Sequence, residues 1–239
     1  GNRVWLRNHY EATINGRWVK PPAIFVSPMS TLTSLAHIIR TNLNMAGRIV
    51  MGKQFSELTD RQMTFISQQK IYFVGTAADT GHVNLSPKGG DSLRVINSTT
   101  LAWLNLTGSG NESAAHVLQN PRMTIMFCDF DGAPLILRTY GTARVLHRQD
   151  PEWPDYSPLF PSSIASRQIF ILDINLVQSS CGMSVPYFDY KGDRNELNQW
   201  SEKQGKAGIE EYWLNKNQQS IDGFDTEIVK RTGLIEPKD

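Results

Sequence analysis

The chain has 239 residues, which is enough for one large domain with a full core, alone or with arms at its ends. Its 24 Lys and Arg residues balance 23 Asp and Glu residues without any block of like charge, so nucleic acid is not expected as a partner. The two cysteines, Cys128 and Cys181, are too far apart in sequence for a CxxC motif, which argues against a zinc site or a disulfide framework. Because no apolar run reaches about 18 residues and the N-terminus lacks a signal-peptide core, we expect a soluble cytoplasmic protein without a membrane partner.

The first fifty residues differ in sequence pattern from the rest of the chain. Asn15-Gly16 predicts a short hairpin, and the apolar spacing across residues 32–43 predicts a short amphipathic helix. We expect residues 1–50 to be an N-terminal extension or an arm that packs on a partner subunit. Residues 51–190 are expected to form the main domain, and residues 191–239 a helical tail.

From residue 56 a helix precedes a series of strands. Thr59 or Asp60 is expected to cap a helix of about three turns that carries Met63 and Ile66 on its apolar face. Strand-like stretches then occupy residues 70–78, 82–89, 92–106, 123–130, 134–148 and 167–180. Turn residues stand where crossover helices would otherwise lie, which indicates antiparallel hairpins. The sequence therefore predicts a mainly β fold, a barrel with peripheral helices.

A glycine-rich loop, GSGNES at residues 108–113, separates a strand from a helix. Unpaired N–H groups at the start of a helix attract anions, so a phosphate is the first ligand to consider. The string approaches the GxGxxG of dinucleotide-binding folds, with Ser113 in the third position and Asp129 as a ribose-binding acid, but the run of strands argues against a doubly wound fold. A tight turn capped by Asn111 or Ser113 is the alternative without a ligand.

Two further features of the sequence supply a positive charge that could bind a phosphate. The stretch VNLSPKGGDS, residues 83–92, brings a hydroxyl, an ammonium and two unhindered backbone amides together, although a solvated lysine in a turn explains the same string. Arg138 lies within an apolar strand, where a guanidinium is costly unless it is paired, liganded or on the exposed face.

Other catalytic motifs are absent from the sequence. It contains no GxSxG, HExxH or GxxxxGK[ST] motif. His82 and His116 flank the two candidate phosphate segments, where a surface or capping role is the alternative to ligand contact. Cys181 is expected to be buried and unreactive, because no neighbouring cation in the sequence would lower its pKa.

The order and spacing of several segments resemble the FMN-binding split-barrel proteins related to pyridoxamine 5'-phosphate oxidase. These segments are FISQQKIYFVGTAA, GHVNLSPKGGDSLRVI, LAWLNLTGSGNESAAHVLQNPRMTIMFCDF and LILRTYGTARV. The later segments VQSSCGMSVPYFDY, RNELNQWSEKQG and NKNQQSIDG are similar to the tail of a bacterial pyridoxamine-oxidase-like branch. The resemblance covers residues 55–223. It implies a six-stranded antiparallel split barrel and a homodimer with FMN at the subunit interface.

The resemblance also implies where the cofactor binds. The strand and turn at residues 83–88 would wrap the flavin edge and phosphate, and the segment at residues 107–109 would lie nearby. Where pyridoxamine oxidases open the following helix with an Arg-Lys pair, this chain has Ala114 and Ala115, so Lys88, Arg138 and Ser113 would share the phosphate with the loop amides. The expected cofactor-binding residues are Val83, Asn84, Leu85, Ser86, Lys88, Gly89, Thr107, Gly108, Ser109, Asn111, Ser113 and Arg138.

The function implied is an FMN-dependent oxidoreductase that acts on a small molecule. No residue is assigned as catalytic acid or base, and no metal is expected; a group from residues 84–86 would tune the flavin potential. Trp200 and Arg194 do not match the C-terminal Trp and Arg that frame the vitamin B6 substrate, so another substrate is expected. The alternatives are a non-enzymatic flavin-binding or redox-responsive module and a split-barrel haem binder.

Overall fold

A computed structural model describes residues 13–14, 17–18 and 52–234 of the chain. The chain divides into two units, residues 1–50 and residues 51–239, and each is described by itself. In the first unit, β1 (Thr13–Ile14) pairs with β2 (Arg17–Trp18) in antiparallel register, as expected for a hairpin at Asn15-Gly16. The helix expected within residues 32–43 lies outside the described residues.

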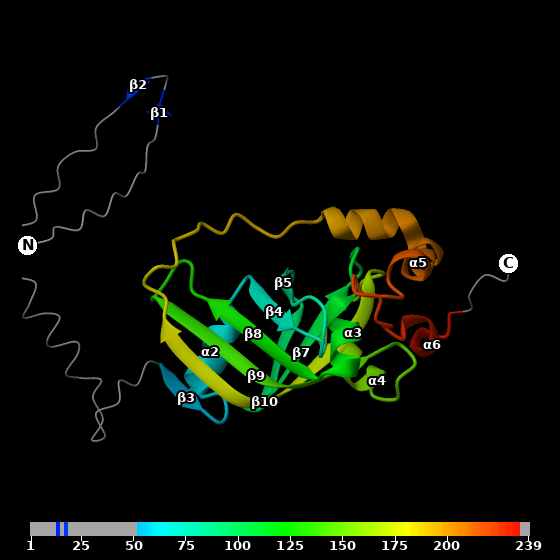
Figure 1. Cartoon of the computed structure of the whole chain (residues 1–239), viewed down its shortest axis with the longest axis horizontal. Helices are drawn as coiled ribbons and strands as arrows, with labels where there is room; N and C mark the ends of the chain where they lie inside the picture. Colours follow the sequence, from blue (N-terminus) through cyan, green and yellow to red (C-terminus); the bar gives the residue numbers. More distant parts are fainter. Residues whose placement is uncertain (1–12, 15–16, 19–51, 235–239) are drawn as a thin grey trace, which may run out of the picture. The chain divides into compact units, whose positions relative to one another are not determined.

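The second unit is built on one antiparallel sheet (Figure 1). Its strands follow the order β5-β4-β8-β9-β10-β7-β6, and β3 pairs with the far half of β10. Their bounds are β3 Lys53–Phe55, β4 Tyr72–Thr76, β5 Asn84–Lys88, β6 Leu93–Asn97, β7 Thr100–Leu106, β8 Arg122–Cys128, β9 Leu135–Leu146 and β10 Ser166–Cys181.

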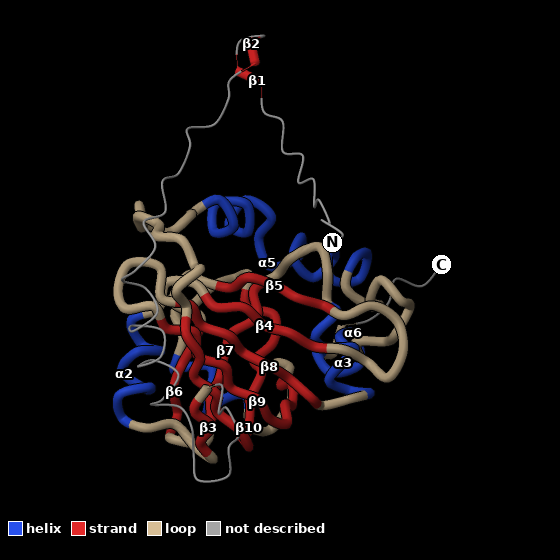
Figure 2. The backbone as a smooth tube through the Cα atoms, turned by 60° about the vertical axis from the view of Figure 1, so that its left-hand side comes forward, coloured by secondary structure: helices blue, strands red, loops and turns tan. Residues whose placement is uncertain are grey.

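Side chains from the two ends of this strand order are in contact, so the sheet curves into a barrel whose end strands β5 and β6 are not paired with each other. Lys88 on β5 donates a hydrogen bond from Nζ to Oδ1 of Asn105 on β7 at 3.2 Å. The hydroxyl of Tyr72 on β4 lies 2.8 Å from Oγ of Ser92, just before β6. The described helices lie around the periphery of the strands (Figure 2). The predicted mainly β split-barrel class is therefore confirmed.

The sheet has eight strands, whereas the sequence predicts six. The stretch at residues 92–106 folds back at Ser98 and Thr99, so it forms the two strands β6 and β7. The additional strand β3 has three residues, too few to show an alternating pattern in sequence.

Alternating side chains of the strands fill the barrel. In β4, Tyr72, Val74 and Thr76 are buried while the residues between them are half-buried, which is the period of two expected for a strand. Trp103 of β7 stacks on Phe170 of β10 with ring centroids 4.4 Å apart and planes within 5°. The opposite faces of β7 and β10 form a second apolar cluster, which contains Phe160.

The helices are α2 Asp60–Gln68, α3 Glu112–Gln119, α4 Trp153–Tyr156 with the 3₁₀ turn η1 Ser157–Leu159, α5 Glu196–Lys216 and α6 Ile228–Thr232. A reciprocal capping box between Thr59 and Gln62 starts α2, so Thr59 is the N-cap. Gly205, with φ of 64°, interrupts α5 and divides it into two helical segments. Within the described part of the chain, no helix is long and apolar enough to cross a membrane.

The expected burial of Cys181 is wrong. Cys181 is exposed, whereas Cys128 is buried, and both thiols are free. Cys181 is the last residue of β10, where the strand has left the covered part of the sheet.

Candidate functional site

The inward face of β5 is polar along its whole length. Asn84, Ser86 and Lys88 alternate with outward residues, and all three are partly covered. Val83 and Leu85 point away from them and are 76% and 66% exposed. Because β5 is at the end of the strand order, the candidate site lies at a strand with one unpaired edge.

A chain of hydrogen bonds joins β5 to helix α3. Ser86 Oγ donates to Asn84 Oδ1, and Asn84 Nδ2 donates to Ser113 Oγ, both at 3.1 Å. Ser113 Oγ in turn lies 3.3 Å from Thr76 Oγ1, which is 3.1 Å from Nδ1 of buried His116. The structure therefore brings Asn84, Ser86 and Ser113 together. These hydrogen bonds hold the amide of Asn84 and the hydroxyl of Ser86 in fixed orientations.

Lys88 is the last residue of β5 and ends this polar face. Its ammonium donates to Asn105 Oδ1 and lies 5.2 Å from the ring centroid of Trp103. Asn105 Nδ2 donates to Gln168 Oε1 at 3.1 Å. Burial, together with the nearby charge of Arg167, lowers the pKa of Lys88 to about 8.

Arg167, near the start of β10, is the site residue that sequence reasoning missed. It is 2% exposed, and its guanidinium donates to the carbonyls of Gly108 at 3.2 Å and Gly110 at 3.0 Å. A third bond, at 2.8 Å, reaches Asn217 Oδ1. Burial lowers the pKa of Arg167 to about 10. The one indication in the sequence was that a charged residue, Arg167, stands at the start of a strongly apolar strand. From sequence alone, a charged residue in that position is expected to be exposed to solvent.

The two cations give this part of the barrel a positive charge that Glu112, which favours the charged form of Arg167, offsets only in part. Neither Lys88 nor Arg167 forms an ion pair with any residue that the structure describes. The acceptors they have are neutral amide and carbonyl oxygens. A buried cation without a counter-ion is unfavourable, so an anionic ligand beside Lys88 would be stabilised.

The glycine-rich loop is fastened to the C-terminal helices through its own carbonyls. Asn217 Nδ2 donates to the carbonyls of Gly108 at 2.9 Å and Ser109 at 3.4 Å. Trp213 Nε1 donates to Thr107 Oγ1 at 2.9 Å. Asn111 precedes α3 without capping it, because its side chain donates to the carbonyl of Asn217. Within this chain the loop presents carbonyls to Arg167, and its contribution is to hold the barrel end together.

The helix that follows the loop is covered as well. Ala114 and Ala115 are fully buried. In the first turn, Glu112 Oε2 accepts a hydrogen bond from the backbone N–H of Ile221 at 2.9 Å. The positions where the resemblance implied an Arg-Lys pair therefore face packed structure in this chain, which accounts for their small size.

The remaining expected residues lie elsewhere. Arg138 on β9 is in register with Met126, which pairs with Phe73, so Arg138 lies on the face of the sheet opposite to Tyr72 and Lys88. Its guanidinium donates to Ser180 Oγ at 3.1 Å. The carbonyl of Gly89 accepts from Ser92 Oγ at 2.7 Å, which shapes the turn after Lys88. Within one chain, Lys88 and Arg138 are not brought together. Among the described residues there is no cluster of His, Cys, Asp and Glu suited to a metal ion.

Comparisons with known proteins identify the family. Residues 58–181 match the family model described as pyridoxamine 5'-phosphate oxidase. Pyridoxamine 5'-phosphate oxidase family protein ustO of Aspergillus flavus is 34% identical over 188 residues, which cover 71% of this chain and 76% of that protein.

Among solved structures, a candidate pyridoxamine 5'-phosphate oxidase from Lactobacillus delbrueckii is 21% identical, with a TM-score of 0.43 over 54% of this chain and 98% of its own. HupZ of Group A Streptococcus is 19% identical, with a TM-score of 0.41 over 50% of this chain and 91% of its own. From the family model, the fungal relative and the antiparallel barrel, the chain belongs to the pyridoxamine 5'-phosphate oxidase family.

Proposed function

We propose that the protein is an FMN-dependent oxidoreductase that acts on a small molecule and works as a homodimer. The observation that carries this proposal is a pair of cations, the half-buried Lys88 and the buried Arg167, that form no ion pair with a carboxylate and lie beside a strand of inward amide and hydroxyl groups. An anionic cofactor with a polar ring edge would complement both features. Family membership supports the same class of function.

The residues present fit a flavin. Asn84 and Ser86 offer side-chain donors and acceptors to a heteroaromatic edge, and Lys88 offers a positive charge. Buried Gln168 Nε2 and Trp103 Nε1 have no hydrogen-bond partner among the described residues, so donor capacity remains at this end of the barrel. A bound flavin would supply hydride or electron transfer, while Lys88 would stabilise negative charge on its ligand.

The homodimer is supported by apolar side chains that one subunit leaves in solvent. Val83 and Leu85 project from the outer face of β5. Met183, Tyr187 and Phe188 are 82%, 79% and 61% exposed in the segment after β10. Exposed apolar side chains of this size are typical of an interface, and a twofold mate would cover them.

Absorbance and binding of the purified protein test the proposal. We expect flavin bands after reconstitution with FMN and tighter binding of FMN than of riboflavin, because only FMN carries the phosphate. A Soret band with haem in place of flavin binding would favour the haem-binding alternative. Flavin that is bound but is not reduced by any nicotinamide donor would favour the non-enzymatic module. Absence of binding by both flavins would refute the cofactor assignment.

A further inference from the structure

A cavity lies against the outer face of β7. It encloses about 300 Å³ between the turn at residues 90–92, the strand β7, the loop at residues 161–164 and the first segment of α5. The β7 residues that line it are Leu104 and Leu106, which belong to the outer face of the strand. Asn105, between them, points inward to Lys88. The cavity and the flavin site proposed above therefore lie back to back across one strand.

The lining of this cavity combines an apolar wall with a polar rim. Leu104, Leu106 and Ile164 form the wall, and Ile164 remains 40% exposed. Hydroxyl groups of serines and the amide of Asn198 contribute the rim. The lining includes two carboxylates, Asp91 and Glu202, and no Lys, Arg or His side chain. A volume of this size, apolar on one side and polar on the other, suits a small organic molecule.

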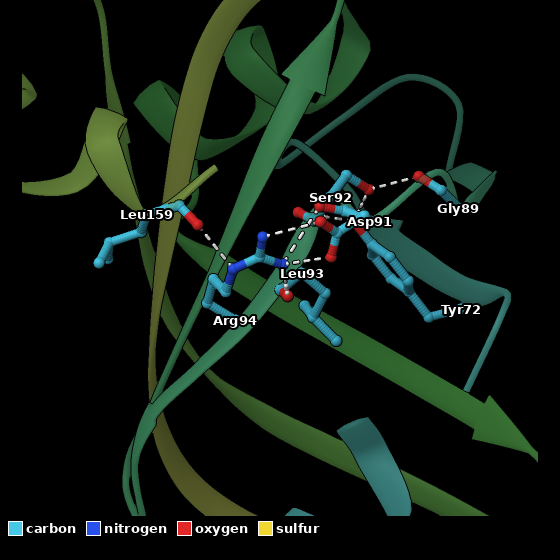
Figure 3. Close-up of polar contacts among 7 residues, drawn as sticks. All are labelled: Tyr72, Gly89, Asp91, Ser92, Leu93, Arg94 and Leu159. Carbon is cyan, nitrogen blue, oxygen red and sulfur yellow. Dashed lines mark hydrogen bonds and ion pairs between the residues drawn. The ribbon is translucent and has the colours of Figure 1, made fainter. Parts of the chain in front are cut away.

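One of the two carboxylates is already neutralised. Asp91 and Arg94 form a two-pronged ion pair, with Nη1 to Oδ1 at 2.7 Å and Nη2 to Oδ2 at 3.0 Å (Figure 3). Arg94 Nε also donates to the carbonyl of Leu159 at 2.7 Å, so its guanidinium is fully committed. Asp91 has a left-handed backbone conformation, with φ of 54°.

Glu202 is therefore the carboxylate that gives the cavity its charge. It is exposed on α5 and forms no ion pair with any residue in the described part of the chain. The cavity thus carries one uncompensated negative charge beside a leucine wall. This is the reverse of the Lys88 and Arg167 side of the same strand, where the uncompensated charge is positive.

We propose that this cavity is a binding site for a small organic cation, a protonated primary amine with an apolar body about the size of a phenyl ring. The ammonium would be held by Glu202 and the rim hydroxyls, and the apolar body would lie against Leu104, Leu106 and Ile164. The turn that lines this site continues directly from Lys88, so the occupied site adjoins the strand that we assign to the cofactor.

Calorimetry with matched probes tests the proposal on the full chain. The probes are 2-phenylethylamine and its neutral counterpart 2-phenylethanol, which share the apolar body and differ in charge. We expect the amine to bind at least about tenfold more tightly than the alcohol, because a charge-assisted contact replaces a neutral one. Glu202→Gln should remove that preference. Glu211→Gln, an exposed carboxylate of the same helix that does not line the cavity, is the matched control and should retain it.

A second variant tests the location of the site. Ser162→Trp places a large side chain at the exposed rim and should abolish binding of the amine, while thermal melting reports whether the variant remains folded. Equal binding of amine and alcohol, an unchanged preference in Glu202→Gln, full binding by folded Ser162→Trp, or no binding of the amine at millimolar concentration would each overturn the proposal. None of these outcomes depends on FMN. The amine site can therefore be refuted without refuting the oxidoreductase proposal, and the reverse is also true.

Discussion

Asp222 holds His82 with both of its carboxylate oxygens, although 140 residues separate the two in sequence. Oδ2 accepts from the backbone N–H of His82 at 2.8 Å, and Oδ1 lies 2.6 Å from the ring nitrogen Nδ1. His82 comes two residues before β5, so this contact fixes the turn that leads into the strand of the proposed flavin site. At Gly81, φ is +86°, and a Cβ atom would lie 2.5 Å from Asp222 Oδ2, so glycine is required beside the pair.

Asp222→Ala should loosen the turn before β5 and weaken FMN binding, and Gly81→Ala should do the same by displacing the carboxylate. We expect Gly81→Ala to lower the free energy of unfolding by about 1 to 2 kcal/mol, since it combines a left-handed backbone with a steric conflict. Thermal melting and an FMN titration measure both variants. If Gly81→Ala binds FMN as the unmodified chain does, the turn does not shape the site.

The pH dependence of the same contact has a defined sign. The hydrogen bonds from the backbone and ring of His82 lower the pKa of Asp222 below its ordinary value. A carboxylate whose folded pKa is depressed contributes stability above its unfolded pKa, and that contribution is lost as pH falls through the folded pKa. The stability difference between the unmodified chain and Asp222→Asn should therefore be largest near neutral pH and should shrink in acid. Urea unfolding at pH 7 and at pH 3 to 4 measures it; a difference that grows in acid would contradict the assignment.

Lys88 should favour ligand binding at the expense of stability. Because its folded pKa of about 8 is below its unfolded value, the buried ammonium destabilises the fold below pH 8, and the penalty disappears as pH rises toward the unfolded pKa. Lys88→Met should raise the free energy of unfolding of the apoprotein by about 1 to 2 kcal/mol at pH 7, an advantage that vanishes near pH 10. The same variant should weaken FMN binding by about 1.5 to 3 kcal/mol. A variant that is less stable and binds FMN normally would show that Lys88 is a packing residue.

Arg138 tests whether a second subunit completes the site. It lies on the sheet face opposite to Lys88, so Arg138 would reach the phosphate of an FMN held beside Lys88 only if that Lys88 belonged to another copy of the chain. Arg138→Ala should weaken FMN binding by about 1.5 to 3 kcal/mol and leave riboflavin binding nearly unchanged. An unchanged dissociation constant for FMN would place the phosphate on the Lys88 side alone.

Arg167 is expected to contribute mainly to the stability of the fold. Arg167→Leu removes the donor to the Gly110 carbonyl and one of the two donors to the Gly108 carbonyl, and it leaves the buried Asn217 Oδ1 without the guanidinium. We expect a loss of about 3 kcal/mol or more in the free energy of unfolding, with Asn217→Ala causing a smaller loss of about 1 to 3 kcal/mol. Chemical denaturation compares the two, and Lys203→Leu, an exposed substitution on α5, is the control. A stable Arg167→Leu variant would mean that water or another donor replaces the guanidinium.

Much of the fold could be predicted from sequence because its signals are local. Thr59 with Gln62 is a capping box within four residues, and the strand-like stretches alternate along their own length. The hairpin at Ser98 and Thr99 was missed because the flanking strands are both apolar and the turn lacks glycine and proline.

The candidate site was less predictable because the hydrogen bonds that build it join residues far apart in sequence. Asn84, Ser86 and Ser113 were found from their segments and lie together in the structure. The partners of the glycine-rich loop, Arg167 and Asn217, come from segments about 60 and 109 residues away. Nothing in the loop itself shows whether its amides or its carbonyls will be used.

The attachment of Asn217 to Gly108 bears on the order in which the chain becomes ordered. Contacts that join residues 109 positions apart pay a large loop-closure entropy and are slow to form. During synthesis the barrel strands through β10 emerge before Asn217, so the nascent barrel would carry Lys88 and Arg167 with the Gly108 loop still unfastened. The last step of folding would then be the docking of the C-terminal helices, and an anionic cofactor present at that stage would help to order the end of the barrel before they arrive.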